Sequence, residues 1–382
     1  MPCDPRPVGR RHFPDNPQVG MSVLLGIVFH FIGGFASGSF YLPYKRVRGW
    51  NWESFWIVGG LFSWLFIPFL AAWITIPDFM SIIRGEELRV LGTTYLFGLL
   101  WGIGGLTYGL GVRYLGVSLG SSIILGLCMV FGALIPALYY DVDPVEGKDG
   151  FGAMVGSAWG RTILLGLAVC LAGIAVCGRA GVRKERELPR EATEGSGSGR
   201  TEYRFALGMT VAVVSGVLSA CFNFGLEAGQ SMARTADLAF SATHPGEGGF
   251  LFRNNVVYVV LLWGGLTTNL VWCLALNARN RSFGDYTDAS RPLAMNYLFS
   301  AIAGTTWFLQ FFFYGMGESR LGNGPSSWIL HMAFIILVAN LWGLFLREWK
   351  DVSPFTRRTL LWGILLILAS VGIVGYGNSL HP

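Results

Sequence analysis

The chain has 382 residues, of which 52% are hydrophobic and only 13% carry a formal charge. Soluble domains average about 25% charged residues, so this composition, with a mean hydropathy of +0.50, excludes a soluble enzyme and indicates a protein that crosses a membrane several times. The net charge of +5 does not indicate nucleic-acid binding, because the basic residues lie between apolar runs.

Residues 1–20 are polar and rich in proline, and they lack the apolar core and cleavage site of a signal peptide. We expect a disordered N-terminal tail, after which the first apolar run acts as an uncleaved signal-anchor. The one long hydrophilic linker, residues 179–204, mixes both charges with a Gly/Ser run and has the composition of a flexible connector.

Ten uncharged apolar runs of 17 to 24 residues follow the tail. Helices of that length cross the hydrocarbon core of a bilayer, about 30 Å thick, and the alternation typical of barrel strands is absent. The sequence therefore predicts an all-α membrane protein with five spans in residues 21–178 and five in residues 205–378. The predicted spans are Val23–Leu42, Phe55–Ile76, Val90–Gly111, Val117–Tyr140, Thr162–Gly178, Phe205–Leu226, Val256–Leu276, Tyr297–Met316, Ser326–Leu346 and Thr359–Tyr376.

Lysine and arginine predict the orientation of these spans. The loops after the odd-numbered spans hold 18 of the 28 basic residues, and the remaining loops and tails hold 10. Basic loops stay in the cytoplasm. We expect the odd loops, including the 179–204 linker, to be cytoplasmic and both termini to be outside.

An internal repeat links the two halves. Residues 205–226 align with residues 23–44 at a constant offset of 182, which pairs Gly26 with Gly208, Gly34 with Gly216, Ser37 with Ser219 and Phe40 with Phe222. Because each half has five spans, the second half runs inverted to the first. Inverted repeats are typical of secondary transporters, whose substrate sites lie between the halves. Two glycine-rich helices that both pack tightly would also give these identities.

Two histidines are the strongest candidates for proton chemistry. None of the 23 acidic and 28 basic residues falls within a predicted span, whereas His30 and His331 do. Their positions along inward-running spans place them roughly 10 Å and 8 Å below the outer surface, and Gln310 comes to a similar depth. Histidine titrates near neutral pH and is costly inside a membrane, which favours a functional role. A neutral histidine bonded to a neighbouring helix is the alternative.

Carboxylates at the ends of spans form a second group of candidates. Glu53 and Glu227 follow or precede apolar runs, where a gating or proton-relay role competes with that of an ordinary solvated side chain. Six cysteines are present, but no CxxC pattern or histidine partner accompanies them. We therefore expect no metal site and no organic cofactor, with the proton as the coupling ion.

Aromatic and amide side chains suit a sugar. An aromatic face stacks on the C–H groups of a sugar ring, and an amide binds hydroxyl groups. Membrane-interface anchoring and helix–helix contacts are the alternative roles. The candidates for substrate binding are Tyr41, Tyr108, Asn269, Trp307, Gln310, Tyr314 and Trp328.

Three segments resemble the bacterial L-rhamnose–proton symporter family of the drug/metabolite transporter superfamily. They are HFIGGFASGSFYLPYKRVRGWNWESFW (residues 30–56), WGIGGLTYGLGVRYLGVSLG (101–120) and the pair WFLQFFFYGMG and SWILHM (within 307–332). The resemblance runs from about residue 21 to residue 378. Positions that match the family's pattern are His30, Tyr41, Lys45, Trp52, Glu53, Tyr108, Arg113, Gln310, Tyr314, Trp328 and His331.

The resemblance implies ten helices in two inverted five-helix repeats, a location in the bacterial inner membrane, and uptake of L-rhamnose or a related deoxy-sugar by proton symport. Gly105 and Glu227 stand where the family has asparagine. An exporter of drugs or metabolites on the same scaffold is a rival reading. An enzyme acting on lipid-linked sugars is a weaker one, because the predicted spans hold no Asp or Glu. The oligomeric state is not predicted.

Overall fold

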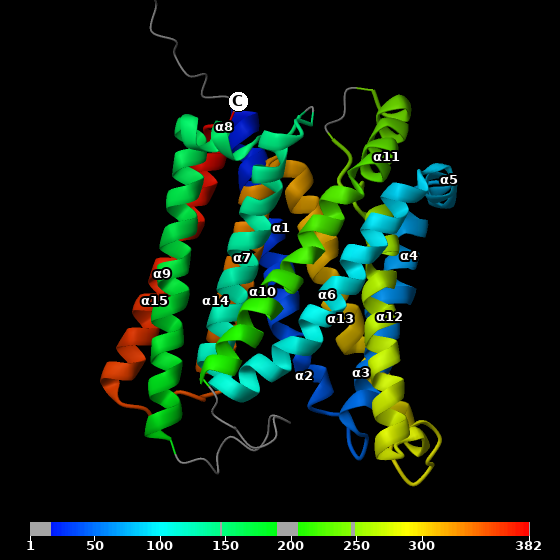
Figure 1. Ribbon diagram of the computed structural model, residues 1–382, viewed down its shortest axis with the longest axis vertical. Coiled ribbons are helices and arrows are strands. Elements are labelled where there is room, and N and C mark those ends of the chain that lie inside the picture. The colour runs from blue at the N-terminus through cyan, green and yellow to red at the C-terminus, as the bar shows by residue number, and fades with distance from the viewer. Residues whose placement is uncertain (1–16, 146, 189–204, 246–248, 382) are drawn as a thin grey trace, which may run out of the picture.

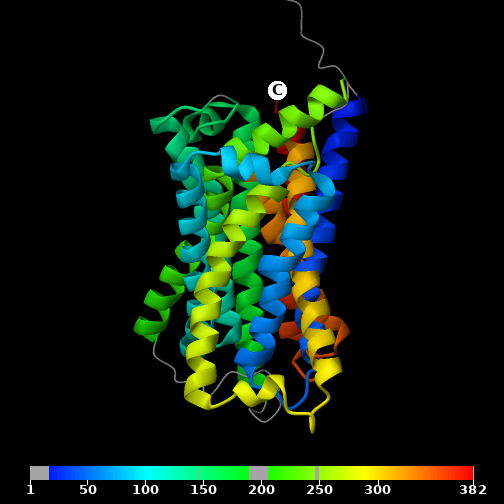
Figure 2. The ribbon, with the colours of Figure 1, turned by 90° about the vertical axis from the view of Figure 1, so that its right-hand side faces the viewer.

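The computed structural model describes residues 17–145, 147–188, 205–245 and 249–381. Within these ranges every regular element is a helix, and the long helices run side by side along one axis (Figures 1 and 2). The elements are α1 (Pro17–Ser39), α2 (Tyr41–Tyr44), α3 (Trp52–Leu61), the π-helix η1 (Phe62–Phe66), α4 (Ile67–Thr75), α5 (Phe79–Gly85), α6 (Leu88–Leu115), α7 (Val117–Val142), α8 (Phe151–Gly156), α9 (Ala158–Glu187), α10 (Phe205–Ala228), α11 (Gln230–Thr243), α12 (Asn255–Asn280), the 3-10 helix η3 (Phe283–Tyr286), α13 (Leu293–Leu321), α14 (Gly324–Phe345) and α15 (Pro354–Ser379).

Nine helical segments in the described ranges are long and apolar enough to cross a membrane. The prediction of an all-α membrane protein is confirmed in this form. The segments are Gly20–Tyr44, Trp52–Thr75, Leu88–Leu115, Leu119–Val142, Ala158–Glu187, Ala206–Ala228, Asn255–Asn280, Gly324–Phe345 and Pro354–Ser379.

Helix α13 accounts for the difference between these nine segments and the ten predicted spans. It has 29 residues, more than α12 (26) or α14 (22), but it carries buried polar side chains that include Asn296, Ser300, Gln310 and Glu318. It packs against α1 on one side and against α3 and η1 on another. Because other helices surround these polar groups, the helix does not need the apolar composition of a lipid-facing span.

The two ends of the helix bundle differ. One end, which we call the α11 end, carries α5, α8 and α11 together with the C-terminus (Figure 1). The beginning of α1 is also there, since the Ser22 hydroxyl donates to the carbonyl of Arg320 at the close of α13 (2.9 Å). The opposite end, which we call the α2 end, carries α2, the beginning of α3 and η3, which contacts α3. Any path across the protein connects these two ends.

Helix α1 lies unusually close to its neighbours. A Cβ atom on Gly26 would come within 2.7 Å of the Leu321 side chain, and one on Gly34 within 2.4 Å of Phe334. No side chain fits at these distances, so glycine lets α13 and α14 approach the backbone of α1. This close contact brings His30 of α1 up against both helices.

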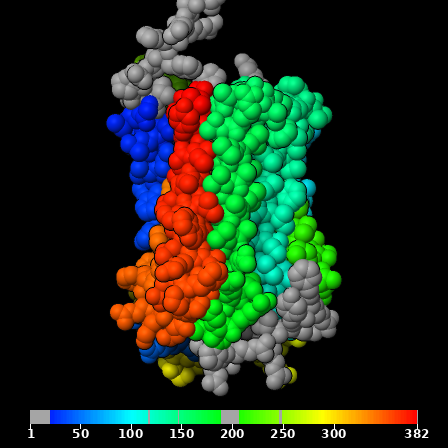
Figure 3. Space-filling view, turned by 90° about the vertical axis from the view of Figure 1, so that its left-hand side faces the viewer, coloured from blue at the N-terminus to red at the C-terminus, as the bar shows by residue number. Residues whose placement is uncertain are grey.

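The outer surface of the bundle is apolar. Figure 3 shows α15 and α9 side by side on one face, with α1 next to α15. The exposed side chains of α15 include Leu361, Trp362, Leu365 and Leu368. Such a surface suits lipid chains rather than water.

Some predicted boundaries differ from the observed ones. Helix α9 continues to Glu187, so the first nine residues of the predicted linker are helical, while 189–204 lie outside the described residues. Helix α1 begins at Pro17, within the predicted tail, and residues 1–16 likewise lie outside them. A span prediction stops at the first charge, but a helix continues into water while its backbone bonds are satisfied.

Candidate functional site

A cluster of three buried rings lies where α1, α13 and α14 meet. The centroids of His30 and Tyr314 are 5.3 Å apart, those of Tyr314 and His331 are 5.1 Å apart, and those of the two histidines are 6.2 Å apart. All three side chains are at most 1% exposed. We call this set the histidine cluster. A Cβ atom on Gly317 would lie 2.7 Å from Nε2 of His30, so the glycine makes room for the ring.

Neither histidine is held by a hydrogen bond. Both ring nitrogens of His30 and both of His331 are buried and make no hydrogen bond to any residue that the structure describes. A buried polar group without a partner costs about 1–3 kcal/mol. The alternative reading of these histidines as hydrogen-bonded packing residues therefore does not agree with the contacts.

The cluster connects to α10 and α7 through a short polar chain. The Tyr314 hydroxyl donates to Oδ1 of Asn223 at 3.4 Å, and Nδ2 of Asn223 donates to the carbonyl of Gly132 at 2.8 Å. Trp328, whose ring centroid is 6.4 Å from that of His331, donates from Nε1 to the carbonyl of Cys128 at 3.1 Å. Groups from both halves of the chain thus meet at this level of the bundle.

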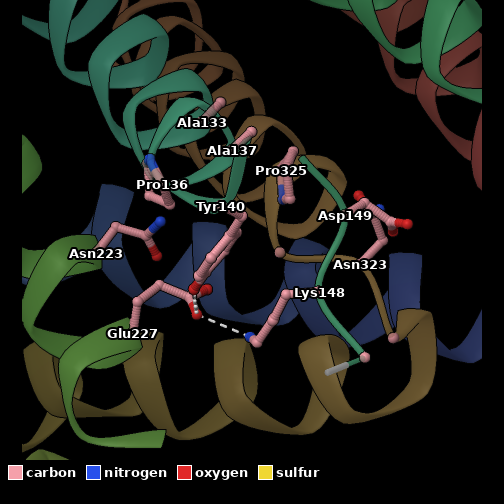
Figure 4. A pocket seen from close by; sticks show the side chains of 13 residues that line it. Ala133, Pro136, Ala137, Tyr140, Lys148, Asp149, Asn223, Glu227, Asn323 and Pro325 are labelled. Carbon is pink, nitrogen blue, oxygen red and sulfur yellow. Dashed lines mark hydrogen bonds and ion pairs between the residues drawn. The ribbon is translucent and has the colours of Figure 1, made fainter. Parts of the chain in front are cut away.

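A pocket opens above the cluster, towards the α11 end. Figure 4 shows that Tyr140 and Lys148 both point towards the Glu227 carboxylate. Tyr140 donates its hydroxyl to Oε2 of Glu227 at 2.6 Å, and Nζ of Lys148 is 2.7 Å from the same oxygen. Asn223 lines this pocket as well as contacting Tyr314, so it joins the pocket to the histidine cluster.

Below the cluster, towards the α2 end, α13 presents Gln310 and Trp307. Gln310 is buried, and its Nε2 donates to the backbone carbonyl of Trp307 at 2.9 Å. A Cβ atom on Gly33 would lie 2.8 Å from the backbone oxygen of Gln310. Gln310 is therefore about one helical turn from the level of His30, close to the common depth that the sequence predicts.

A polar network closes the α2 end. Buried Glu53 accepts hydrogen bonds from Asn280 (2.9 Å) and Ser282 (2.7 Å), and buried Asp285 accepts from the Ser54 hydroxyl (2.8 Å). Burial alone raises the pKa of Asp285, but hydrogen bonds from the Asn51 backbone and from side chains, together with a nearby arginine guanidinium, outweigh it and lower that pKa below its usual value. The network ties α3 to the segment after α12.

The chain is similar to known proteins over nearly its whole length. A family model described as "L-rhamnose-proton symport protein" matches residues 19–380. Curated relatives named L-rhamnose-proton symporter include those of Cronobacter sakazakii (strain ATCC BAA-894), 37% identical over 363 residues, and Pectobacterium carotovorum (strain PC1), 35% identical over 362. These alignments cover 94% of this chain and 98–99% of the relatives. The chain belongs to the L-rhamnose–proton symport family.

The family resemblance of the sequence segments is thus confirmed over the whole bundle. Among the predicted site residues, His30, Tyr314, His331 and Trp328 lie together. Trp307 and Gln310 lie on α13, the helix that also carries Tyr314. Glu227 lines the pocket at the α11 end. Asn269 lies on α12, where its Oδ1 accepts a hydrogen bond from Nε1 of Trp56 (3.0 Å).

Three predicted residues of the symport-family chain lie away from this set. Tyr41 is 40% exposed near the α2 end, and Glu53 belongs to the network there. Tyr108 sits on α6, where its hydroxyl donates to Ser121 at 2.7 Å. No group of three or more His, Cys, Asp or Glu side chains suited to a metal ion occurs in the part of the chain that the structure describes.

Some residues of this site did not stand out in the sequence of the family member. The partners of Glu227 are Tyr140 and Lys148, 87 and 79 positions away. Lys148 is the only lysine in the loop between the fourth and fifth predicted spans, which is a weak signal. Nothing in the sequence distinguishes Trp64 from the other aromatic residues of the spans.

Proposed function

We propose that the protein imports L-rhamnose, or a related deoxy-sugar, together with protons through the bacterial inner membrane. The observation that carries this proposal is the histidine cluster: two titratable rings, buried and without hydrogen bonds to described residues, at the meeting point of three helices. The names of the relatives supply the sugar and the ion. A transporter rather than an enzyme follows from the same family membership.

Two features support ten spans in the proposed orientation. Helix α13 is enclosed between α1 and α3, both of which are candidate spans, so it crosses the bilayer with them. The loops at the α2 end hold most of the basic residues, which favours the cytoplasm on that side. The α11 end, with its pocket, then faces outward.

Helix contacts support two inverted repeats. Helix α1, the first span of one half, packs against α13 and α14, the third and fourth spans of the other half. Helix α10, the first span of the second half, packs against α6 and α7, the third and fourth spans of the first half. The last spans, α9 and α15, pack against each other. An inverted repeat requires this reciprocal exchange.

Individual residues repeat the same contacts. Gly26 touches Leu321 at the end of α13, and Gly208, which the sequence aligns with Gly26, touches Leu115 at the end of α6. Gly34 touches Phe334 of α14, and its partner Gly216 touches Leu127 of α7. A resemblance due only to glycine content would not reproduce the contacted positions.

Alternating access gives the cluster its role. An imidazolium is costly in a site without water or an anion, so protonation of His30 or His331 favours a conformation that opens the cluster to water. Binding of the sugar between the halves supplies free energy that brings the protonated protein through the closed state. Glu227 would take part in proton entry from the outer pocket, and Glu53 in its exit at the α2 end.

The sugar would lie between the halves, below the cluster. Gln310 supplies an amide for hydroxyl groups, and Trp307 supplies an aromatic face. Tyr314 and Trp328 would border the sugar on the side of the histidines. The more distant Asn269, Tyr41 and Tyr108 would contact it only in another conformation.

Uptake of radiolabelled L-rhamnose into proteoliposomes tests this function. We expect uptake to accelerate when the outside is acidified, and a His30→Ala, His331→Ala double variant to lose that acceleration. The exposed His244, altered to Ala, is the matched control and should behave as wild type. Uptake indifferent to the gradient in the wild type would refute symport, whereas full coupling in the double variant would refute the role of the histidines.

A further inference from the structure

Four tryptophans pack together in the middle of the bundle. Trp64 is central: its ring centroid lies 6.0 Å from that of Trp56, 6.2 Å from that of Trp101 and 5.8 Å from that of Trp307. These residues come from three different spans and from both halves of the chain. We call them the tryptophan cluster.

The backbone around Trp64 departs from a regular helix. Residues Phe62–Phe66 form a π-helix between α3 and α4, so this span has one widened turn. Such turns carry a cost and occur often at functional sites. Gly60, one turn earlier, leaves room for the indole, since a Cβ atom there would lie 2.4 Å from the Trp64 ring. The local sequence thus places a large ring where a regular helix would not.

The indole nitrogen of Trp64 has no hydrogen-bond acceptor among the described residues, although the side chain is only 3% exposed. The neighbouring indoles behave differently. Trp56 donates to Asn269, and Trp328 donates to the carbonyl of Cys128. An unsatisfied buried donor costs about 1–3 kcal/mol, so Trp64 points to a ligand with an acceptor oxygen.

A small cavity adjoins this indole, with room for about one water molecule. Trp64 lines it together with Trp56 and Trp307, and with Phe40, Tyr44, Gly60 and Ser63. The lining is aromatic with a few polar atoms, which is the composition of a site for a sugar ring. The cavity is smaller than a sugar, so the surrounding rings must move apart to admit one.

We propose that Trp64 is a sugar-binding residue: its indole N–H donates to a hydroxyl or ring oxygen of the substrate in the tryptophan cavity. This inference rests on the proposed function and locates its substrate. An apolar drug would not satisfy the indole N–H, which favours a sugar.

The cavity also communicates with the histidine cluster. Phe311 lies between them, with its ring centroid 5.2 Å from that of Trp307 and 5.8 Å from that of His331. A sugar that displaces Trp307 therefore presses on Phe311 and, through it, on the proton site. Phe311 is thus one packed ring through which sugar binding reaches the histidines.

Binding of L-rhamnose to the purified protein, measured by titration calorimetry, tests the role of Trp64. The Trp64→Phe variant keeps an aromatic ring and removes only the N–H and part of the face. We expect it to raise the Kd of L-rhamnose roughly 3- to 10-fold, the effect of one neutral hydrogen bond. The matched control is Trp73→Phe on the same span, where Trp73 is 66% exposed, and its Kd should equal that of the wild type.

A second measurement does not depend on the stability of the variant. With ¹⁵N-labelled tryptophan in the wild type, the Trp64 indole signal, identified by its absence in Trp64→Phe or by selective labelling, should move on addition of L-rhamnose. An unchanged Kd in Trp64→Phe, or an unmoved indole signal at saturating sugar, would overturn this inference alone. A wild type that binds no L-rhamnose would instead overturn the proposed function and this inference with it.

Discussion

When the two halves of the chain are aligned, a second place corresponds to the histidine cluster, and the two places differ in chemistry. Counting back from the paired leucines Leu115 and Leu321, Tyr108 corresponds to Tyr314. The alignment that pairs Gly26 with Gly208 pairs His30 with Ala212. Counting back from Leu127 and Phe334, Ile124 corresponds to His331. Ala212 and Ile124 are both fully buried and pack in a small apolar cluster with Leu115 and Tyr108.

The difference separates what the fold needs from what transport needs. Both places require close helix packing, and a glycine lies at each: Gly317 beside His30, and Gly111 beside Ala212 and Ile124. In the counterpart Tyr108 has its hydrogen bond to Ser121, and the packing is complete without a histidine. The histidines therefore occupy only one of the two related places, the one nearer the end proposed to face outward.

The substitution His331→Ile, which gives the histidine cluster the residue that its counterpart has at Ile124, should have the largest effect. In His331→Ile we expect the stimulation of uptake by an inward proton gradient, on the order of 5- to 150-fold for an ordinary coupling free energy, to disappear. Sugar exchange without a gradient should remain, and the Tm should stay or rise, because a buried polar ring gives way to an apolar side chain. Ile124→Val is the control. Gradient-driven uptake that survives in His331→Ile would contradict a special role for the histidine cluster.

A substitution of Ile124, the residue that corresponds to His331, should affect stability only. Ile124→Ala removes buried methyl groups and should lower the free energy of unfolding by about 2–5 kcal/mol. The ratio of protons to sugars, measured from pH change and uptake in the same vesicles, should stay the same. A changed ratio would mean that the apolar cluster also handles protons.

The two tyrosines offer a subtler comparison. Tyr108→Phe breaks the bond to Ser121 and should cost about 0.5–1.5 kcal/mol of stability, with no change in the pH dependence of uptake. Tyr314→Phe removes the weaker contact with Asn223 and should cost less stability. It should nevertheless shift the pH of half-maximal uptake, because the hydroxyl is the polar group of a ring that packs against both histidines. Identical pH profiles for the two variants would remove Tyr314 from the proton path.

The smallest expected effect concerns the polar network at the α2 end. The pKa of Asp285 is lowered in the folded protein, so its stabilising contribution is fully present above its ordinary value of 3.8 and is lost only as the pH falls through the lowered one. Between pH 5 and 8 the difference between the Tm of the wild type and that of Asp285→Asn should stay constant. They should converge only at more acidic pH. Divergence near neutral pH would assign proton-linked behaviour to this network as well.

Much of the fold followed from the sequence because it depends on length and composition. Uncharged runs gave the helices, and residue counts brought His30 and His331 to one depth. The rotation of each helix about its own axis, in contrast, does not follow from length and composition. Tyr108 and Tyr314 look alike as sequence candidates, yet only Tyr314 contacts the histidines, since that depends on which helices pack against which face.

Other features leave no periodic trace. The π-turn at Phe62–Phe66 adds no unusual residue to its span, so the position of Trp64 was not foreseeable. The pairing of Glu227 with Lys148 joins the end of α10 to the distant loop between α7 and α8, and charge alone does not select the partner. Both arise from tertiary packing, which local patterns do not encode.

The polar character of α13 has a consequence for how the protein is made. A helix that carries Asn296, Ser300 and Gln310 gains little from entering lipid alone. It becomes stable in the membrane only when partners cover those groups, and its closest partner, α1, is synthesised near the start of the chain. Insertion of the later half thus depends on the earlier half being already in place. Assembly of this protein is a cooperative event rather than a series of independent ones.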